Sequence, residues 1–132
     1  MSQPFIDTNV LLYAFGSDQR SAAAGEVLAA GGIVAVQSLN EFVNVARRKF
    51  RLTWAETREA LAQIRMLCTV RQVVTLQTHE QALYLAERYG LNVHDAMLLA
   101  IALEAGCDTF ISEDLQDGLR VEGRLTVRNP FA

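Results

Sequence analysis

Four acidic residues stand at positions where an α/β chain could use them for chemistry. Asp7 interrupts the apolar stretch "FIDTNVLLY" at residues 5–13, and Glu41 lies in "SLNEF". Asp95 follows in "NVHD" and Asp114 in "FISED". Carboxylates gathered at one place repel each other unless a cation lies between them. The sequence therefore predicts a cation site, provided that the fold brings these four acids together.

The kind of cation follows from the ligands. Carboxylate oxygens without cysteine and with little histidine are typical of Mg²⁺ or Mn²⁺ sites. A metal held by carboxylates serves phosphoryl chemistry, where it activates a water molecule and stabilises the charge of an in-line displacement. We therefore expect Mg²⁺ or Mn²⁺ as the cofactor, and a phosphate ester as the substrate.

Each acid also has an ordinary structural explanation. Asp7 could cap a helix that begins directly after it. Glu41 and Ser38 form the spacing of a capping box, Asp95 suits the first turn of a helix, and Asp114 suits a turn after a strand. Taken singly, these structural roles are sufficient. Only the four positions together indicate a site.

Short apolar runs alternate along the chain with longer helical patterns. This alternation predicts a three-layer α/β fold around a central, mostly parallel, five-stranded sheet. In such sheets ligands bind at the carboxyl ends of the strands, where Asp7 falls. Asp95 precedes a strand, so topology alone does not place it there. The expected strands are residues 4–6, 33–36, 72–75, 109–111 and 125–128, and the expected helices are one near residue 8 and residues 18–30, 39–50, 54–67, 79–89 and 95–105.

Capping boxes are predicted at two further helix starts, Thr53 with Glu56 and Thr78 with Gln81. The length of 132 residues and a hydrophobic content of 51% indicate one domain over residues 1–132. No signal sequence or membrane-spanning run is visible, and the two cysteines are expected to be buried and reduced. The sequence therefore predicts a cytoplasmic protein.

The charge of the chain leaves room for a nucleic acid partner. The net charge is −3, but without the four acids above 11 acidic residues face 12 basic ones. The run Arg47, Arg48 and Lys49 is a candidate contact for RNA phosphates, or else a solvated helix end. His94 precedes Asp95 as in metal phosphohydrolases, but the further histidines of those sites are missing. We interpret His94 as a helix-entry residue.

These motifs, in this order and spacing, resemble the PIN-domain nucleases, and most closely the VapC-type ribonuclease toxins of bacterial toxin–antitoxin pairs. The resemblance rests on "FIDTNVLLY", "SLNEF" and "HDAMLLAIALEAGCDTFISEDLQDG", and runs from Phe5 to Phe131. It implies a PIN-like domain with helices on both faces of a parallel sheet, and divalent-metal-dependent cleavage of RNA. It also implies a homodimer and a cognate antitoxin that blocks the acidic site.

Carried over by position, the resemblance makes Asn9 and Ser112 polar groups that steady the acids. Asp117 is either a further ligand or a solvated loop acid. The catalytic and metal-binding residues would be Asp7, Glu41, Asp95 and Asp114.

Two other classes of protein stay open. A haloacid-dehalogenase-like phosphatase also has an acid after its first strand, but it needs a second acid at the position of Asn9 and a lysine, and Lys49 is the only lysine in the chain. A PIN-derived binding module would keep the fold without chemistry. Metal-dependent RNA cleavage that is lost in Asp7→Asn, set against hydrolysis of a small phosphate ester, distinguishes the three.

Overall fold

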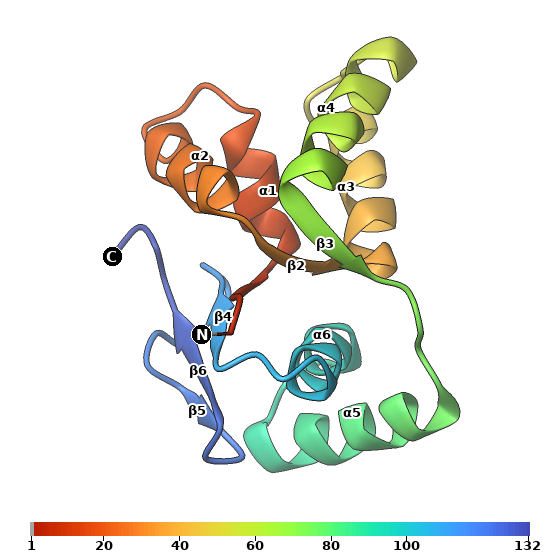
Figure 1. The fold of residues 1–132 in the computed structure, drawn as a ribbon, viewed down its shortest axis with the longest axis vertical. Coiled ribbons are helices and arrows are strands. Elements are labelled where there is room, and N and C mark those ends of the chain that lie inside the picture. The colour runs from red at the N-terminus through yellow and green to blue at the C-terminus, as the bar shows by residue number, and fades with distance from the viewer. Residues whose placement is uncertain (1) are drawn as a thin grey trace.

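Six strands form one sheet in the computed structural model, which describes residues 2–132. The strand order is β3-β2-β1-β4-β6-β5, and all neighbours pair in parallel except β5 and β6 (Figure 1). The mostly parallel sheet is as expected, but it has six strands rather than five. The strands are β1 (Phe5–Ile6), β2 (Gly32–Ala35), β3 (Cys68–Arg71), β4 (Thr109–Ile111), β5 (Arg120–Val121) and β6 (Leu125–Arg128).

Helices cover both faces of this sheet, which confirms the three-layer arrangement. Figure 1 shows α5 and α6 on one side of the strands and the other four helices on the opposite side. A separate hydrophobic core lies beneath each group. The helices are α1 (Thr8–Ala14), α2 (Ser21–Ala30), α3 (Val36–Arg48), α4 (Trp54–Leu67), α5 (Leu76–Tyr89) and α6 (Val93–Glu104).

The two central strands are held in register by residues that alternate between the two cores. Phe5 pairs with Phe110, and their stacked rings lie 5.2 Å apart in the core beneath α5 and α6. Ile6 pairs with Ile111 and belongs to the other core. A slip by one residue would exchange the faces of these buried side chains. The register therefore fixes where β1 ends and Asp7 begins.

Gly32 is required where β2 approaches β1. A Cβ atom there would lie 2.7 Å from the carbonyl oxygen of Pro4 and 2.8 Å from the Cδ1 atom of Ile6. The same Pro4 oxygen accepts a hydrogen bond from the Ile33 amide at 2.8 Å. A larger residue would separate the strands that carry the site.

The predicted strand at residues 72–75 is wrong. Strand β3 follows α4 directly and pairs with β2 from Cys68 onward, because Cys68 is the residue that packs into the core. Val73 is 68% exposed, and Thr75 already caps α5. The sixth strand, β5, arises from a hairpin whose turn places both Glu122 and Gly123 at positive φ.

The capping box of Thr53 and Glu56 is confirmed, with amide-to-side-chain bonds of 2.8 and 3.0 Å. The box of Thr78 and Gln81 is wrong. Thr75 caps α5 instead and exchanges hydrogen bonds with Thr78.

Three other helices differ from the predicted bounds. Helix α3 begins at Val36, so Ser38 lies inside its first turn and Glu41 is no part of a capping box. Helix α2 begins at Ser21 rather than residue 18, since Asp18 accepts the Arg20 amide in a turn. Helix α6 begins at Val93 rather than residue 95.

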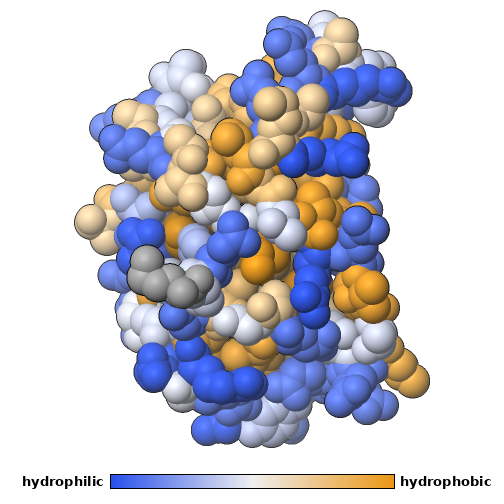
Figure 2. Space-filling view, in the orientation of Figure 1, coloured by the Kyte–Doolittle hydropathy of each residue, from blue (hydrophilic) through white to orange (hydrophobic). Residues whose placement is uncertain are grey.

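The surface seen in Figure 2 carries hydrophobic patches between hydrophilic side chains. Within residues 2–132, no helix combines the length and the apolar character needed to cross a membrane. Cys68 and Cys107 are buried free thiols, as expected.

Candidate active site

Asp7 lies at the carboxyl end of β1 and is only 5% exposed. Its Oδ1 atom accepts the Thr8 amide at 2.7 Å, so Asp7 does cap α1. Its Oδ2 atom accepts the Ser112 hydroxyl at 2.8 Å from the loop after β4. The structural role and a role in the site are therefore compatible, because each uses a different oxygen.

Asn9 and Ser112 connect Asp7 to Asp114. The Asn9 amide donates to Asp7 Oδ2 at 3.4 Å and lies 3.5 Å from the Ser112 hydroxyl oxygen. Ser112 is fully buried and also accepts the backbone amide of Asp114 at 3.1 Å. The side chain of Asp114 is left exposed beside them. Asn9 and Ser112 therefore contact the acids, and their steadying role stays a prediction.

Glu41 reaches the same place from the second turn of α3. Its Oε2 atom lies 2.8 Å from the Nε2 atom of His94 and accepts the Thr8 hydroxyl at 3.4 Å. His94 therefore contacts an acid of the site, although we expected it only at a helix entry. Thr8 was missed, because a threonine after a helix cap carries no pattern that distinguishes it from a structural residue.

Asp95 is the third residue of α6, and Asn92 caps that helix. The Asp95 amide donates to Asn92 Oδ1 at 2.8 Å, and the Asn92 side-chain amide donates to Asp95 Oδ2 at 2.9 Å. This reciprocal pair fixes the direction of the carboxylate. The spacing N-x-x-D at a helix start is a capping signal, so Asn92 was recognisable in the sequence.

The electrostatics show that the four acids share one region. The pKa of Asp7 is raised to about 6, chiefly by burial and also by the charges of Asp95 and Asp114, against the lowering effect of its bonds from Ser112 and Thr8. Burial also raises the pKa of Asp95. The Asn92 bond and His94 oppose that rise, while Asp114 and Glu41 add to it. Each acid is therefore within electrostatic reach of at least one other.

The donor set fits a hard divalent cation. Among the described residues, no donor binds Glu41 Oε1, Asp95 Oδ1 or the carboxylate of Asp114. Over residues 2–132, no three His, Cys, Asp or Glu side chains are arranged to hold an ion together. Mg²⁺ retains several waters and is commonly held by one or two protein carboxylates. The acids leave oxygens free, and the pKa values of Asp7 and Asp95 are raised. Both features suit a partly hydrated cation, and they do not form a site in which protein ligands surround the ion.

Two candidate residues are engaged elsewhere. Arg47 donates to the Leu52 carbonyl at 2.7 Å, and its guanidinium lies 4.2 Å from the centre of the Trp54 ring. Arg48 and Lys49 stay exposed at the end of α3. Asp117 accepts the Asn129 amide at 2.8 Å, which ties it to the segment after β6.

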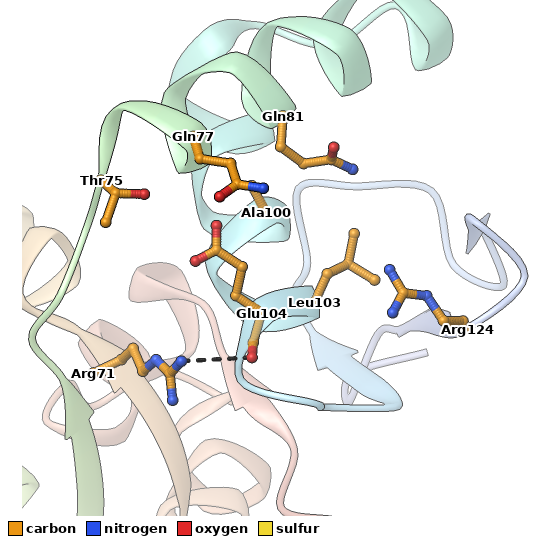
Figure 3. Close-up of a pocket in the computed structure, with 8 residues that line it drawn as sticks. All are labelled: Arg71, Thr75, Gln77, Gln81, Ala100, Leu103, Glu104 and Arg124. Carbon is orange, nitrogen blue, oxygen red and sulfur yellow. Dashed lines mark hydrogen bonds between the residues drawn. The ribbon is translucent and has the colours of Figure 1, made fainter.

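A hollow lies at the other end of α6 (Figure 3). It has a volume of about 560 Å³ and contains one carboxylate, Glu104, whose Oε2 atom accepts the Thr78 hydroxyl at 3.1 Å. Arg71 and Arg124 line it from β3 and from the turn between β5 and β6, so its lining carries more positive than negative charge. This hollow lacks the clustered acids that the chemistry requires.

Comparison with solved structures finds the same fold in toxin–antitoxin proteins. A toxin–antitoxin complex from Klebsiella pneumoniae is 22% identical with a TM-score of 0.70, covering 96% of this chain and 97% of that one. VapC20 from Mycobacterium tuberculosis, described as a sarcin-ricin loop cleaving toxin, is 22% identical with a TM-score of 0.67, covering 83% and 90%. VapBC2 from Rickettsia felis, bound to a promoter DNA fragment, is 16% identical with a TM-score of 0.68, covering 95% and 96%. At these identities the likeness concerns the fold.

No curated protein sequence matches the chain. A family profile described as PIN domain matches residues 5–117. The match includes all four acids and the strands and helices that position them. This family match does not support the phosphatase alternative. The chain belongs to the PIN domain family.

Proposed function

We propose that this protein is a divalent-metal-dependent endoribonuclease, the toxin of a VapC-type toxin–antitoxin pair. The observation that supports the proposal is that four carboxylates from four separate segments each lie within electrostatic reach of at least one other, with the pKa of the buried Asp7 raised to about 6. The fold brings these negative charges near one another, and no arginine or lysine pairs with them among residues 2–132. Such an arrangement costs stability unless it serves a cation.

The metal would supply Lewis-acid stabilisation of the phosphate and a water activated for attack. Asp7, Glu41, Asp95 and Asp114 would supply its carboxylate ligands, with water completing the coordination, since no three of them already surround one point among the described residues. Ser112, Asn9 and the Thr8 amide orient Asp7, while Asn92 orients Asp95. These contacts hold the acids ready, so less reorganisation is needed when substrate binds.

The fold neighbours support RNA as the substrate and a protein partner. VapC20 is described as cleaving the sarcin-ricin loop, and the Klebsiella pneumoniae structure is a toxin–antitoxin complex. We extend these properties to this chain as part of the proposal, together with a homodimer, a single nuclease domain over residues 1–132 and a cytoplasmic location. Light scattering of the purified protein, alone and with the product of a neighbouring small open reading frame, tests the assembly.

The decisive experiment follows cleavage of single-stranded and structured RNA by the parent and by Asp7→Asn. We expect cleavage with Mg²⁺ or Mn²⁺, none in excess chelator, recovery when metal is added back, and none in the variant. Asp117→Asn is the matched control, since Asp117 is an exposed acid tied to Asn129. Undiminished cleavage in chelator, or full activity of Asp7→Asn, would exclude this function. Hydrolysis of a small phosphate ester in place of RNA would favour the phosphatase instead.

A further inference from the structure

The loop after β4 carries Ser112 and Asp114 into the site, and Glu113 stands between them. Its side chain does not join the other acids. Glu113 Oε1 accepts the Tyr13 hydroxyl of α1 at 2.8 Å, and its Oε2 atom accepts the Nε atom of Arg20 at 2.6 Å. One carboxylate thus ties this loop to α1 and to the residue before α2.

The backbone of Glu113 is tied to the site as well. Its amide donates to Asn9 Oδ1 at 3.4 Å, while the side-chain amide of Asn9 donates to Asp7. The residues on either side, Ser112 and Asp114, are joined by the bond from the Asp114 amide to the Ser112 hydroxyl. A shift of Glu113 would therefore move the contacts of Asp7 and Asp114 together.

The partners of Glu113 are themselves held in place. The backbone amide of Arg20 donates to Asp18 Oδ1 at 2.7 Å, and its guanidinium lies 5.2 Å from the centre of the Tyr13 ring. The Tyr13 ring also meets Phe131 edge-on at 5.2 Å. Through Tyr13 and Arg20, Glu113 is therefore connected to α1, to the start of α2 and to the C-terminal segment.

Charge distinguishes Glu113 from the other acids. Arg20 pairs with it, so Glu113 adds little to the negative field of the crevice. We propose that Glu113 is a positioning residue, which fixes Asp114 and Ser112 by clamping their loop to Tyr13 and Arg20. This inference rests on the proposed nuclease function and assigns Glu113 no contact with metal or RNA.

A second cluster of the same side-chain types provides a control. Arg88 pairs with Glu122 at 2.8 Å and binds the Tyr84 hydroxyl at 2.8 Å. Glu122 lies in the turn before β6, at the edge where β6 begins, whereas the acidic site lies where β1 and β4 end. Breaking this pair removes a similar partly exposed interaction away from the acids.

The experiment compares Glu113→Ala, Glu113→Gln and Tyr13→Phe with Glu122→Asn. Asn is used in the control because Glu122 has a φ of 53°, which Asn tolerates better than Ala. The measurements are Mn²⁺ affinity by electron spin resonance, kcat and KM on RNA, hydrogen exchange of the Asp114 amide, and melting temperature.

We expect Glu113→Ala to weaken Mn²⁺ binding and lower kcat by about 10- to 100-fold, as for other residues that orient ligands. KM should stay constant, and Asp114 amide exchange should rise at least about 10-fold. The melting temperature should fall by about 4 °C or less, because the ion pair is partly exposed. Glu113→Gln keeps an acceptor for Tyr13 and should recover most of the loss. Tyr13→Phe should reproduce part of it, and Glu122→Asn none.

Two results would overturn the inference. One is a Glu113→Ala protein with the Mn²⁺ affinity, kcat and exchange of Glu122→Asn. The other is Glu113→Gln being as impaired as Glu113→Ala, which would mean that charge matters rather than position. If Glu113→Ala does not fold, Glu113→Gln and Tyr13→Phe decide by the same criteria. The parent protein could also cleave no RNA while exchange of the Asp114 amide still rises in Glu113→Ala. That result would exclude the proposed nuclease function but not the positioning role of Glu113.

Discussion

The two ends of α6 each carry an acid, but in opposite surroundings. Asp95 lies near the first turn and Glu104 is the last residue, about 14 Å away along the helix axis. Burial and the charges of Asp114 and Glu41 raise the pKa of Asp95. Glu104 instead accepts the Thr78 hydroxyl and shares its hollow with two arginines. The hollow around Glu104 is therefore lined by more basic than acidic side chains.

Under the proposed function, a cluster of acids without basic partners indicates the site better than a cavity does. The hollow around Glu104 measures about 560 Å³, yet one acid and two arginines line it, so it offers no excess of negative charge. The acids near Asp95 lie close together without an arginine or lysine paired to them among residues 2–132. A bound cation would balance the negative charge of these acids.

The strongest test of this comparison is to neutralise one acid near each end of α6. Asp114→Asn should lower kcat by about a thousandfold, because under the proposed function it removes the negative charge of a carboxylate that holds the metal, and should leave RNA binding intact. Glu104→Gln should leave both quantities unchanged. Single-turnover cleavage and filter binding measure the two effects. Equal kcat losses in both variants would mean that the crevice has no special role.

The second prediction concerns the pH dependence of stability without metal. The pKa of Asp7 is raised from 3.8 to about 6 in the folded state, so the folded protein takes up this proton before the unfolded chain does. Stability in chelator should therefore rise as pH falls, by about 2 kcal/mol between about pH 7.5 and 4.5 relative to Asp7→Asn. Glu104→Gln should keep the parent's slope. Urea unfolding at several pH values measures this, and parallel curves for parent and Asp7→Asn would contradict it.

The third prediction asks which basic residues attract RNA. Replacing Arg47, Arg48 and Lys49 by Ala should raise KM about 10-fold, with kcat nearly unchanged. The salt slope should fall by about 0.7 for each RNA phosphate that these side chains neutralise in the parent. Melting must be recorded too, because Arg47 binds the Leu52 carbonyl.

The paired control replaces Arg71 and Arg124 in the hollow of Figure 3. It should change neither KM nor the salt slope. If this control raises KM while the triple substitution does not, the RNA contact belongs to the hollow, and the basic run is a solvated helix end.

The smallest expected effect is the change in melting temperature of Asp95→Asn, at the N-terminal end of α6. Asp95→Asn should abolish cleavage, yet in chelator it should be no less stable than the parent, because it removes repulsion from Asp114 and Glu41. Differential scanning calorimetry with and without metal measures this. A fall in melting temperature of more than about 4 °C would show that Asp95 is chiefly a structural residue of the first turn.

Local patterns in the sequence were sufficient for much of the fold. Helix α4 and strands β4 and β6 lie at the predicted residues, since helix formers, a capping box and β-branched runs agree there. Strand β3 was misplaced by four residues because both candidate stretches carry β-branched residues. Only pairing with β2 and burial of Cys68 choose between them.

The sequence by itself indicated the residues that we propose for the chemistry: the four acids, their order, and the positions of Asp7 and Asp114 after β1 and β4. It left open whether Asp95 lies in the same crevice, since α6 precedes β4. The tertiary structure decided that question, and it also gave Glu113 its partners Tyr13 and Arg20 and set His94 against Glu41. The physical reason is distance along the chain. Caps and strand ends depend on neighbours within a few residues, whereas contacts between remote segments exist only once the sheet and its two cores have formed.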